Sequence, residues 1–320
     1  MNFIDEWGFI ILSNVSIVLL NWNGDEDTID CLESLKSLDY PNFDVYLVDN
    51  NSENKSITNI KNYLNNDSFY NSVLVEKEDL LGFQKKDETN LVFILNDNNA
   101  GFAGGNNVAL NYIKDNVFSG YVMLLNNDTI VSEDLLTGLV NKFNESEDIG
   151  FVGATHYYYH DKNKLQTVGG GNIDLVHGEC SAVTTFGVQE EFDFLTGSCI
   201  LMSCDVLRNV GVMDEEYFMY WEDVDWSTCA RKKGYKLTIS DTGYIYHKEG
   251  ASIKSVSRIY YHTRNRILYM KRNTSGLTYY KFMIYIVLYV LKESTTNFFK
   301  NREYSLALLR GLKDALLKII

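Results

Sequence analysis

The stretch VSIVLLNWNG, residues 15–24, decides the predicted fold because an apolar run passes directly into a polar turn. Its first six residues are rich in β-branched side chains, which is typical of a buried strand. Asp25–Asp27 then offer carboxylates that can cap a helix, and apolar residues follow at near-helical spacing from Ile29 to Leu38. Phe43–Val48 predicts a second strand. The whole is a βαβ unit, which implies parallel strands and a right-handed crossover.

The same alternation continues outward from this unit. Leu91–Leu95 and Tyr121–Leu125 predict two more buried strands, with a glycine-bearing loop and a helix near 106–114 between them. Segment 53–90 is polar and acidic, and we expect a helix followed by a variable excursion there. Through about residue 150 the pattern predicts an α/β fold with an open, doubly wound, mostly parallel sheet.

The remainder of the chain predicts mixed structure and then helices. Residues 151–200 contain short strand-like runs, Glu222–Lys233 predicts a helix that Gly234 ends, and Tyr235–Ile239 predicts a strand. From residue 256 to 320 the pattern is helical, with basic and aromatic residues interleaved. We therefore expect a C-terminal helical extension after the α/β part.

Composition narrows the function classes. The 320 residues carry 29 Lys and Arg against 43 Asp and Glu, a net charge of −14, and 45% are hydrophobic. A core of this size excludes a disordered chain. The acidic balance argues against nucleic-acid binding. The net negative charge also gives an anionic ligand no long-range attraction. Such a ligand would need a local positive charge, such as a bound metal ion.

Three further features bear on redox chemistry and location. Five cysteines without C-x-x-C spacing argue against a disulfide framework or a structural zinc site. Asp5 and Glu6 stand where a signal peptide would have a basic region, so none is expected. The apolar run Phe282–Leu291 is too short to span a bilayer, but it could lie on a membrane or in a packing surface. We expect a cytoplasmic protein, with peripheral contact at the inner face of the cell membrane as an open alternative.

Polar residues follow each of the four strands of the predicted sheet. These are Asn21-Trp22-Asn23-Gly24, Asp49-Asn50-Asn51-Ser52, Asn96–Asn99 with Gly101–Asn107, and Asn126-Asn127-Asp128. In open α/β sheets ligands bind at the carboxyl ends of the strands, and amides with carboxylates suit a nucleobase and ribose. Ordinary turn chemistry is the alternative, because Asn, Asp and Gly are common in turns. Neither a G-x-G-x-x-G after the first strand nor a phosphate-binding P-loop is present.

The densest chemical cluster is Tyr217–Trp226, which holds three carboxylates and five aromatic residues. Repulsion and partial burial raise carboxylate pKa values, which suits a general base. A helix N-terminus, where acids favour the dipole, is the alternative. Asp128 stands at the end of a buried strand, where its carboxylate could bind a hard divalent cation. His247 follows a strand and is either a ligand or a structural histidine. The basic stretch 260–272 could meet a diphosphate or a membrane phosphate, or form a solvated helix face.

Taken in order, these motifs resemble the inverting family 2 glycosyltransferases of GT-A fold. Within them, the rhamnosyltransferase-like and galactofuranosyltransferase-like branch is the nearest. The resemblance covers about residues 15–252. It rests on VSIVLLNWNG, VYLVDNNS, NNAGFAGGNN, LLNNDT, FLTGSCILMSCDVL, EEYFMYWEDVDWSTCARKKGY and YHKEGAS, with YYHTRNRILYMKRN beyond them. It implies a glycosyltransferase domain at 1–255, with a donor-binding half at about 15–130 and an acceptor and catalytic half at about 131–255.

The resemblance assigns donor contacts to the carboxyl edge of the sheet. Asp49 would contact the nucleobase of the donor. The same nucleotide pocket would include Asn21, Trp22, Asn23 and Asn51. Ribose and phosphate contacts would come from Asn99, Gly101, Gly104 and Asn106.

The resemblance also assigns the catalytic and metal groups. Asn126-Asn127-Asp128 would stand at the D-x-D position, with Asn126 where the first Asp often stands, Asn127 beside the donor and Asp128 as a ligand of Mg²⁺ or Mn²⁺. His247 would be the second metal ligand. Asp223 would be the general base. Trp221, Glu222 and Asp225 would shape the acceptor site.

The implied reaction is a single displacement on a UDP- or dTDP-linked sugar by a hydroxyl of a glycan or lipid-linked acceptor, in cell-surface polysaccharide synthesis. Two other functions stay open. A sugar-phosphate nucleotidyltransferase would need a glycine-rich basic loop after the first strand. A non-catalytic nucleotide- or sugar-binding module would not need Asp223. The region 256–320 is expected to contact a membrane or a second subunit.

Overall fold

A computed structural model describes residues 3–4, 10–187, 189, 191–248 and 256–319. Its centre is a ten-stranded mixed sheet. The main path of that sheet is β5 (Ser72–Glu76), β6 (Leu91–Leu95), β4 (Phe43–Asp49), β3 (Val15–Asn21), β7 (Tyr121–Asn126), β14 (Cys199–Ser203), β9 (Ile149–Tyr158), β15 (Lys236–His247) and β8 (Thr129–Val131). The strands from β5 to β7 are parallel, whereas β14 is antiparallel to both of its neighbours. The predicted α/β sheet is therefore confirmed, with a mixed second half.

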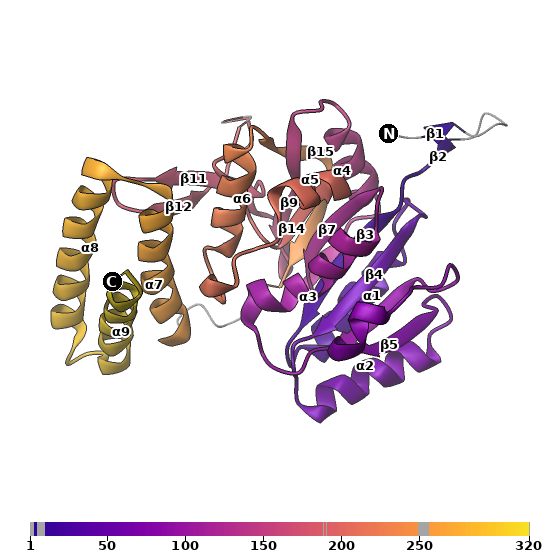
Figure 1. Ribbon diagram of the computed structural model, residues 1–320, viewed down its shortest axis with the longest axis horizontal. Helices are drawn as coiled ribbons and strands as arrows, with labels where there is room; N and C mark the ends of the chain where they lie inside the picture. The colour runs from indigo at the N-terminus through magenta and orange to yellow at the C-terminus, as the bar shows by residue number, and fades with distance from the viewer. Residues whose placement is uncertain (1–2, 5–9, 188, 190, 249–255, 320) are drawn as a thin grey trace.

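Helices cover both faces of this sheet, as Figure 1 shows. On one face α1 (Asp25–Leu35), α2 (Asn54–Asn66) and α4 (Leu135–Phe143) share a core that includes Ile17 and Leu19 of β3. On the other, α3 (Gly101–Asn116), α5 (Cys204–Val210) and α6 (Glu222–Lys232) share a core that includes Val18. Alternate β3 side chains enter opposite cores, so the apolar run of this strand is buried on both sides.

Several predicted elements differ in detail from the observed ones. The polar segment 53–90 contains the edge strand β5 and a 3₁₀ helix, Lys77–Gly82, in addition to α2. Asp25–Asp27 do not cap α1: they fill its first turn, and Asp25 accepts a hydrogen bond from Asn59 at 2.7 Å. The strand predicted at Tyr235–Ile239 continues to His247.

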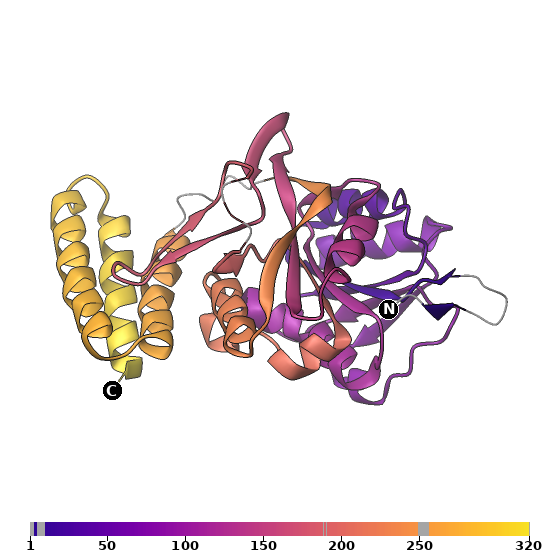
Figure 2. The same ribbon diagram turned by 90° about the horizontal axis from the view of Figure 1, so that it is seen from above.

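A smaller sheet links the α/β part to the C-terminal helices. It contains β11 (Gly170–Asp174), β12 (Glu179–Ala182) and β13 (Phe194–Leu195), while β10 (Asp161–Thr167) pairs irregularly with β9. Figure 2 shows the β11–β12 hairpin extending toward the C-terminal helices. Arg266 bonds to the His177 carbonyl at the tip of this hairpin. The hairpin therefore connects the α/β part to the C-terminal helices through this contact with α7 (Val256–Asn273).

The C-terminal extension is helical, as predicted. It consists of α7 (Val256–Asn273), α8 (Gly276–Asn297) and α9 (Arg302–Ile319). These helices share an apolar core with Tyr217, Trp221 and Val224 of the α/β part. The predicted domain boundary at 255/256 lies at the end of residues 249–255, which the structure does not describe. The last four residues of the YHKEGAS motif also lie outside the described residues. Within the described residues, no helix has both the length and the apolar character needed to cross a membrane.

Candidate active site

The ends of β3 and β4 are joined through the buried side chain of Asn21. Its amide nitrogen donates to Asp49 Oδ2 at 2.6 Å, and its carbonyl oxygen accepts from Gly24 and Thr28 at 3.1 and 3.0 Å. Asp49 Oδ1 accepts from the Ser52 backbone N–H at 2.8 Å. Asn21 therefore positions Asp49, a carboxylate at this edge.

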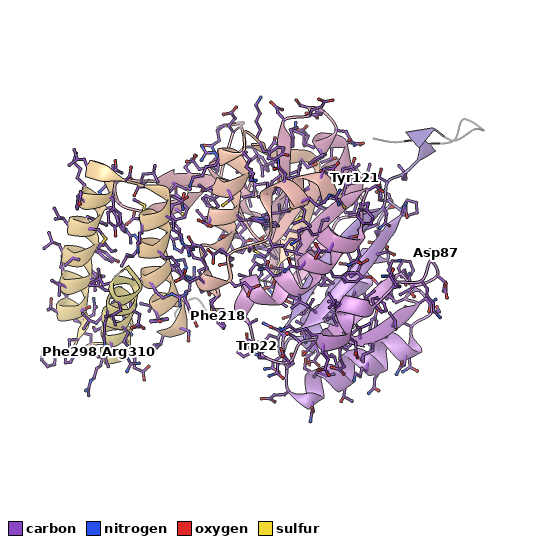
Figure 3. All side chains as sticks on the ribbon, viewed as in Figure 1. Trp22, Asp87, Tyr121, Phe218, Phe298 and Arg310 are labelled. Carbon is purple, nitrogen blue, oxygen red and sulfur yellow. The ribbon has the colours of Figure 1, made fainter. Side chains whose placement is uncertain are left out.

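The turns that follow β3 and β4 keep two asparagines in a left-handed conformation. Asn23 and Asn51 have φ values of 54° and 61°, which asparagine tolerates better than most residues. Asn23 also accepts a hydrogen bond from the Glu53 backbone at 2.7 Å, which ties the two turns together. Between them Trp22 is 56% exposed, and Figure 3 labels it at the edge of the molecule where β3 ends. Its ring is free to stack on a planar ligand.

Asn50 joins β4, β6 and the start of α3. Its amide nitrogen donates to Asn99 Oδ1 and to the Gly101 carbonyl, each at 3.0 Å. Its carbonyl oxygen accepts from Asn96 at 3.0 Å and from the Ala100 N–H at 3.1 Å. Asn50 therefore orients Asn99, which was a predicted site residue, although Asn50 itself was not.

The expected glycine loop after β6 is wrong, because Gly101–Asn107 form the first turns of α3. A Cβ at Gly104 would lie 2.8 Å from Ala100 Cβ, and one at Gly105 would lie 2.6 Å from Leu20. Asn106 Nδ2 bonds to the Phe102 carbonyl at 2.9 Å within the helix. The absence of a side chain at Gly105 lets α3 pack closely on Leu20 of β3.

Asp128 and His247 meet at the junction of β7, β8 and β15. His247 Nε2 lies 3.3 Å from Asp128 Oδ1, and His247 Nδ1 lies 3.1 Å from Gln166 Oε1. Burial opposes ionisation of Asp128, but the adjoining imidazole outweighs it and lowers the pKa of Asp128. Asn127 is turned toward α1, where its amide donates to Thr28 at 2.8 Å. The predicted metal pair is therefore brought together, and Asn127 lies behind it.

This pair fits a divalent cation. Gln166 can accept the Nδ1 proton of His247, which leaves the Nε2 lone pair facing Asp128. Asp128 Oδ1 and Asn126 Oδ1 are buried, and neither has a hydrogen-bond partner among the described residues. No cluster of three or more His, Cys, Asp or Glu suited to a metal occurs in the described part of the chain. Asp128 and His247 could therefore hold an ion only with help from ligand or water oxygens.

The segment before α6 is held in a strained conformation. Phe218, Tyr220 and Trp221 have φ values of 64°, 66° and 77°, which side chains other than glycine rarely adopt. Asn265 of α7 fixes this segment, because its Nδ2 lies 2.7–2.8 Å from the carbonyls of Tyr217, Met219 and Tyr220. We call residues 217–223 the catalytic loop, because the predicted general base Asp223 stands at its end.

Glu222 and Asp223 are neighbouring carboxyls with different surroundings. Asp223 accepts backbone hydrogen bonds from Gly197 and Val224, each at 2.9 Å. Burial raises the pKa of Asp223, and these hydrogen bonds partly oppose the shift. Burial and then the charge of Asp223 raise the pKa of Glu222 well above its usual value, and Glu222 Oε2 has no partner in the described structure. Asp223 is therefore the easier of the two to ionise.

Two adjoining cavities meet at these carboxyls. The first, about 580 Å³, is lined by Asn126, Gln166, His247 and the Gly197 backbone as well as by Glu222 and Asp223. The second, about 690 Å³, runs between the β12 strand and helices α7–α9, and it includes Trp221, Glu222 and Asp223. His247 of the predicted metal pair and the candidate base thus line one cavity, which adjoins the second, and Asp128 lies 3.3 Å from His247.

Asp225 lies apart from both cavities in the described structure. Its Oδ1 accepts hydrogen bonds from the Tyr217 hydroxyl at 3.1 Å and from Asn273 at 2.9 Å. Its contacts therefore brace the catalytic loop and α7, whereas Trp221 and Glu222 line the second cavity.

Several residues of the site were not predicted. Gly197 and Asn265 lie in the motifs FLTGSCILMSCDVL and YYHTRNRILYMKRN, so their neighbourhoods were recognised although their roles were not. Gln166 and His156 carry no motif. His156 Nε2 lies 2.5 Å from the Ser198 hydroxyl, and burial, followed by the nearby His247, lowers the pKa of His156 to about 3. His156 is therefore a neutral wall of the cavity.

The first half of the sheet is parallel and has polar residues at its carboxyl edge. The second half is mixed and brings a buried carboxylate next to that edge. This is the arrangement of GT-A-like glycosyltransferases. A family model described as "Glycosyltransferase like family 2" matches residues 13–266. The chain belongs to this family, which confirms the predicted family and the predicted class of enzyme, a glycosyltransferase. The narrower rhamnosyltransferase-like and galactofuranosyltransferase-like branch stays a prediction.

Known proteins agree with this assignment. The chain is 20% identical over 271 residues to the low-salt glycan biosynthesis hexosyltransferase Agl10 of Haloferax volcanii, covering 81% of this chain and 76% of that protein. It is similar in fold to the mannosyltransferase PcManGT from Pyrobaculum calidifontis, solved with GDP-Man and Mn²⁺ (TM-score 0.57, 11% identity, 95% and 87% of the two chains). It is also similar to S. aureus TarS 1–349 solved with UDP-GlcNAc (TM-score 0.55, 17% identity, 94% and 80%). At these identities the two structures support the fold alone.

Proposed function

We propose that this protein is a metal-dependent, inverting glycosyltransferase that transfers a sugar from a nucleoside diphosphate to an acceptor hydroxyl. One observation carries the proposal: Asn126, His247 and Asp223 line a single cavity, and Asp128 lies 3.3 Å from His247. A candidate metal ligand and a candidate general base therefore line one cavity, with the second candidate ligand next to His247, and this arrangement supports displacement at a sugar carbon. PcManGT with GDP-Man and Mn²⁺ and TarS with UDP-GlcNAc provide support by analogy.

The residues of this chain divide the work. Asp49, Trp22 and Asn99 would hold the nucleoside at the carboxyl edge of the sheet. Asp128 and His247 would hold Mg²⁺ or Mn²⁺, which when bound supplies positive charge to the diphosphate. Asp223 would accept the proton of the attacking hydroxyl, and its raised pKa makes it a stronger base than an ordinary aspartate.

The acceptor would enter through the second cavity. Trp221, Tyr289 and Tyr304 offer aromatic surface there, and Glu222 stands where this cavity meets the first. Aromatic faces suit sugar rings, and the orphan oxygen of Glu222 suits a hydroxyl. A glycan or lipid-linked acceptor, in cell-surface polysaccharide synthesis, remains part of this proposal, as does a UDP- or dTDP-linked donor.

The first test is calorimetric titration of UDP, and then dTDP, into the protein with Mn²⁺. We expect a Kd near one micromolar, about −8 kcal/mol, for one of the two nucleotides. The substitution Asp128→Ala should clearly weaken nucleotide binding in the presence of Mn²⁺. Glu26→Ala on α1 is a charge-matched control that should bind as the wild type does. Absence of heat with both nucleotides would contradict the donor pocket.

The second test concerns the base. Asp223→Asn should lower kcat by about 100-fold or more while nucleotide binding stays unchanged. The wild-type kcat should fall as the pH is lowered through the raised pKa of Asp223, because the protonated carboxyl cannot accept a proton. Full transfer activity in Asp223→Asn would favour a different base. Tight nucleotide binding without transfer to any hydroxyl acceptor would favour the binding-module alternative.

A further inference from the structure

Charge is divided unevenly between the two parts of the chain. Residues 256–320 contain twelve Lys or Arg and three Asp or Glu, a net charge of +9. Because the whole chain carries −14, the first 255 residues carry −23. Arg266 and Arg272 pair with acids of the first 255 residues, and the remaining positive charge favours an anionic partner for the C-terminal helices.

Helix α8 has an apolar stripe on its exposed side. Leu277, Tyr280, Ile284, Leu288 and Leu291 recur every three or four residues and are 48–69% exposed. The opposite side of the helix is buried, because Phe282, Ile286 and Val290 pack in the C-terminal core. The stripe is therefore additional to the apolar surface that this helix needs for folding.

Basic and aromatic side chains border the stripe. Lys281 and Lys292 stand four residues after Leu277 and Leu288, one turn along the same side of the helix, and both are exposed. The turn after α8 carries Phe299, which is 97% exposed, and Lys300 follows it. The single acid of α8, Glu293, accepts a hydrogen bond from Asn297 and so belongs to the helix's own contacts.

Both views place α8 at the outer end of the molecule, with α7 between it and the large sheet (Figures 1 and 2). Nothing in the acidic part therefore stands in front of the stripe. A flat surface could approach the stripe of α8, because the second cavity is lined by other residues of this helix, Ile286 and Tyr289.

We propose that the stripe of α8, with Lys281, Lys292, Phe299 and Lys300, docks on the surface of an anionic lipid bilayer. Apolar side chains would enter the headgroup boundary while the lysines meet lipid phosphates. Charge favours this partner over a second copy, because pairing two α8 stripes would bring two units of net charge +9 together. The surface is separate from the active site, so its test is independent of the proposed reaction.

The test is co-sedimentation of the full chain with phosphatidylcholine vesicles, with and without phosphatidylglycerol. The wild type should bind the anionic vesicles and lose binding at high salt. The double substitution Ile284→Glu and Leu288→Glu should weaken binding by about tenfold or more, because it removes apolar contact and adds negative charge. Leu81→Glu, a matched change at a residue that is 97% exposed in the donor half, should have no effect.

Two measurements keep the result unambiguous. The melting temperature and UDP or dTDP binding of the double variant should equal those of the wild type, so a loss of vesicle binding reports the surface alone. Equal vesicle binding by the double variant would overturn the proposal. So would a concentration-dependent dimer that the double variant abolishes, because the partner would then be a second copy.

Discussion

Glu222 is the residue whose burial is least compensated at the site. Its pKa is raised well above the usual value, first by burial and then by Asp223, and its Oε2 lacks a partner in the described structure. A carboxyl that binds its proton more tightly when folded stabilises the fold at low pH. That stabilisation is lost as the pH rises through the raised pKa. The fold therefore favours the protonated form of Glu222 over the ionised form.

Glu222→Gln tests this directly. At pH 4 the variant and the wild type should melt at similar temperatures, because both side chains are neutral in the folded protein. At pH 8 the variant should be more stable, by about 1–3 kcal/mol, because it removes the need to bury a charge. Thermal melting across this range provides the measurement. Glu33→Gln, at an exposed residue of α1, is the control, and a gain in Glu222→Gln that does not depend on pH would contradict the assignment.

Single residues also show where sequence reasoning reached its limit. The rule that ligands bind at strand ends predicted that Asn21 and Asp49 lie at one edge of the sheet, and their side chains are 2.6 Å apart there. The sequence could not reveal that the Asn21 side chain is hydrogen-bonded to Asp49, Gly24 and Thr28. The direction of a side chain depends on neighbours that folding brings together. Gln166 carried no signal at all, since it lies in β10, whose pairing with β9 is shifted twice in register.

At the scale of elements, α7 is the support of the catalytic loop. Asn265 and Arg264 of this helix donate to carbonyls of Glu216, Tyr217, Met219 and Tyr220. Arg272 adds ion pairs to Asp214 and Glu216. A loop with three strained aromatic residues persists only where its surroundings impose it, and here α7 does so.

Asn265→Ala should therefore release the loop. The carbonyls of Met219 and Tyr220 lose the Asn265 donor, whereas Tyr217 keeps Arg264. The free energy of unfolding should therefore fall by about 1–3 kcal/mol, and kcat should fall about tenfold or more as Asp223 loses its fixed position. Nucleotide affinity should stay unchanged, since the donor edge is built from other elements. Asn297→Ala on α8, whose side chain bonds only within its own turn among the described contacts, is the matched control. A variant with lowered nucleotide affinity and normal kcat would contradict this role.

Elements differed in how well the sequence predicted them. Strands β3, β4, β6 and β7 are buried over most of their length, so each gave a predominantly apolar run. Strand β5 was missed because it lies at the sheet edge, where only Val75 is buried. The start of α3 was placed five residues late, because glycines that commonly mark a loop here allow close packing on Leu20.

At the scale of the molecule, the two parts share a core. Tyr217, Trp221 and Val224 pack with Ile267, Tyr269 and Met270 of α7, and the Thr228 and Tyr269 hydroxyls lie 2.9 Å apart. The C-terminal helices are therefore packed against the catalytic half. The proposed division at residue 255 marks a change in sequence pattern, but the residues on its two sides share one apolar core.

A chain cut after residue 255 should consequently fail in a particular way. It should lose transfer activity and melt at a lower temperature, because the apolar faces of Tyr217 and Trp221 become exposed and the loop loses its anchors. Nucleotide binding, measured by calorimetry, should persist more fully than transfer. A truncated protein that transfers sugar at the rate of the full chain would refute the shared-core argument.

The position of α7 has a thermodynamic consequence. One helix contacts α8 and α9 on one side and holds the catalytic loop on the other, so whatever steadies the helices also favours the ordered loop. Linkage is reciprocal: if docking of α8 tightens the binding of an acceptor by some factor, the acceptor must tighten docking by the same factor. A membrane would then act as an allosteric activator as well as an anchor, and the enzyme would remain attached longest where acceptor is plentiful.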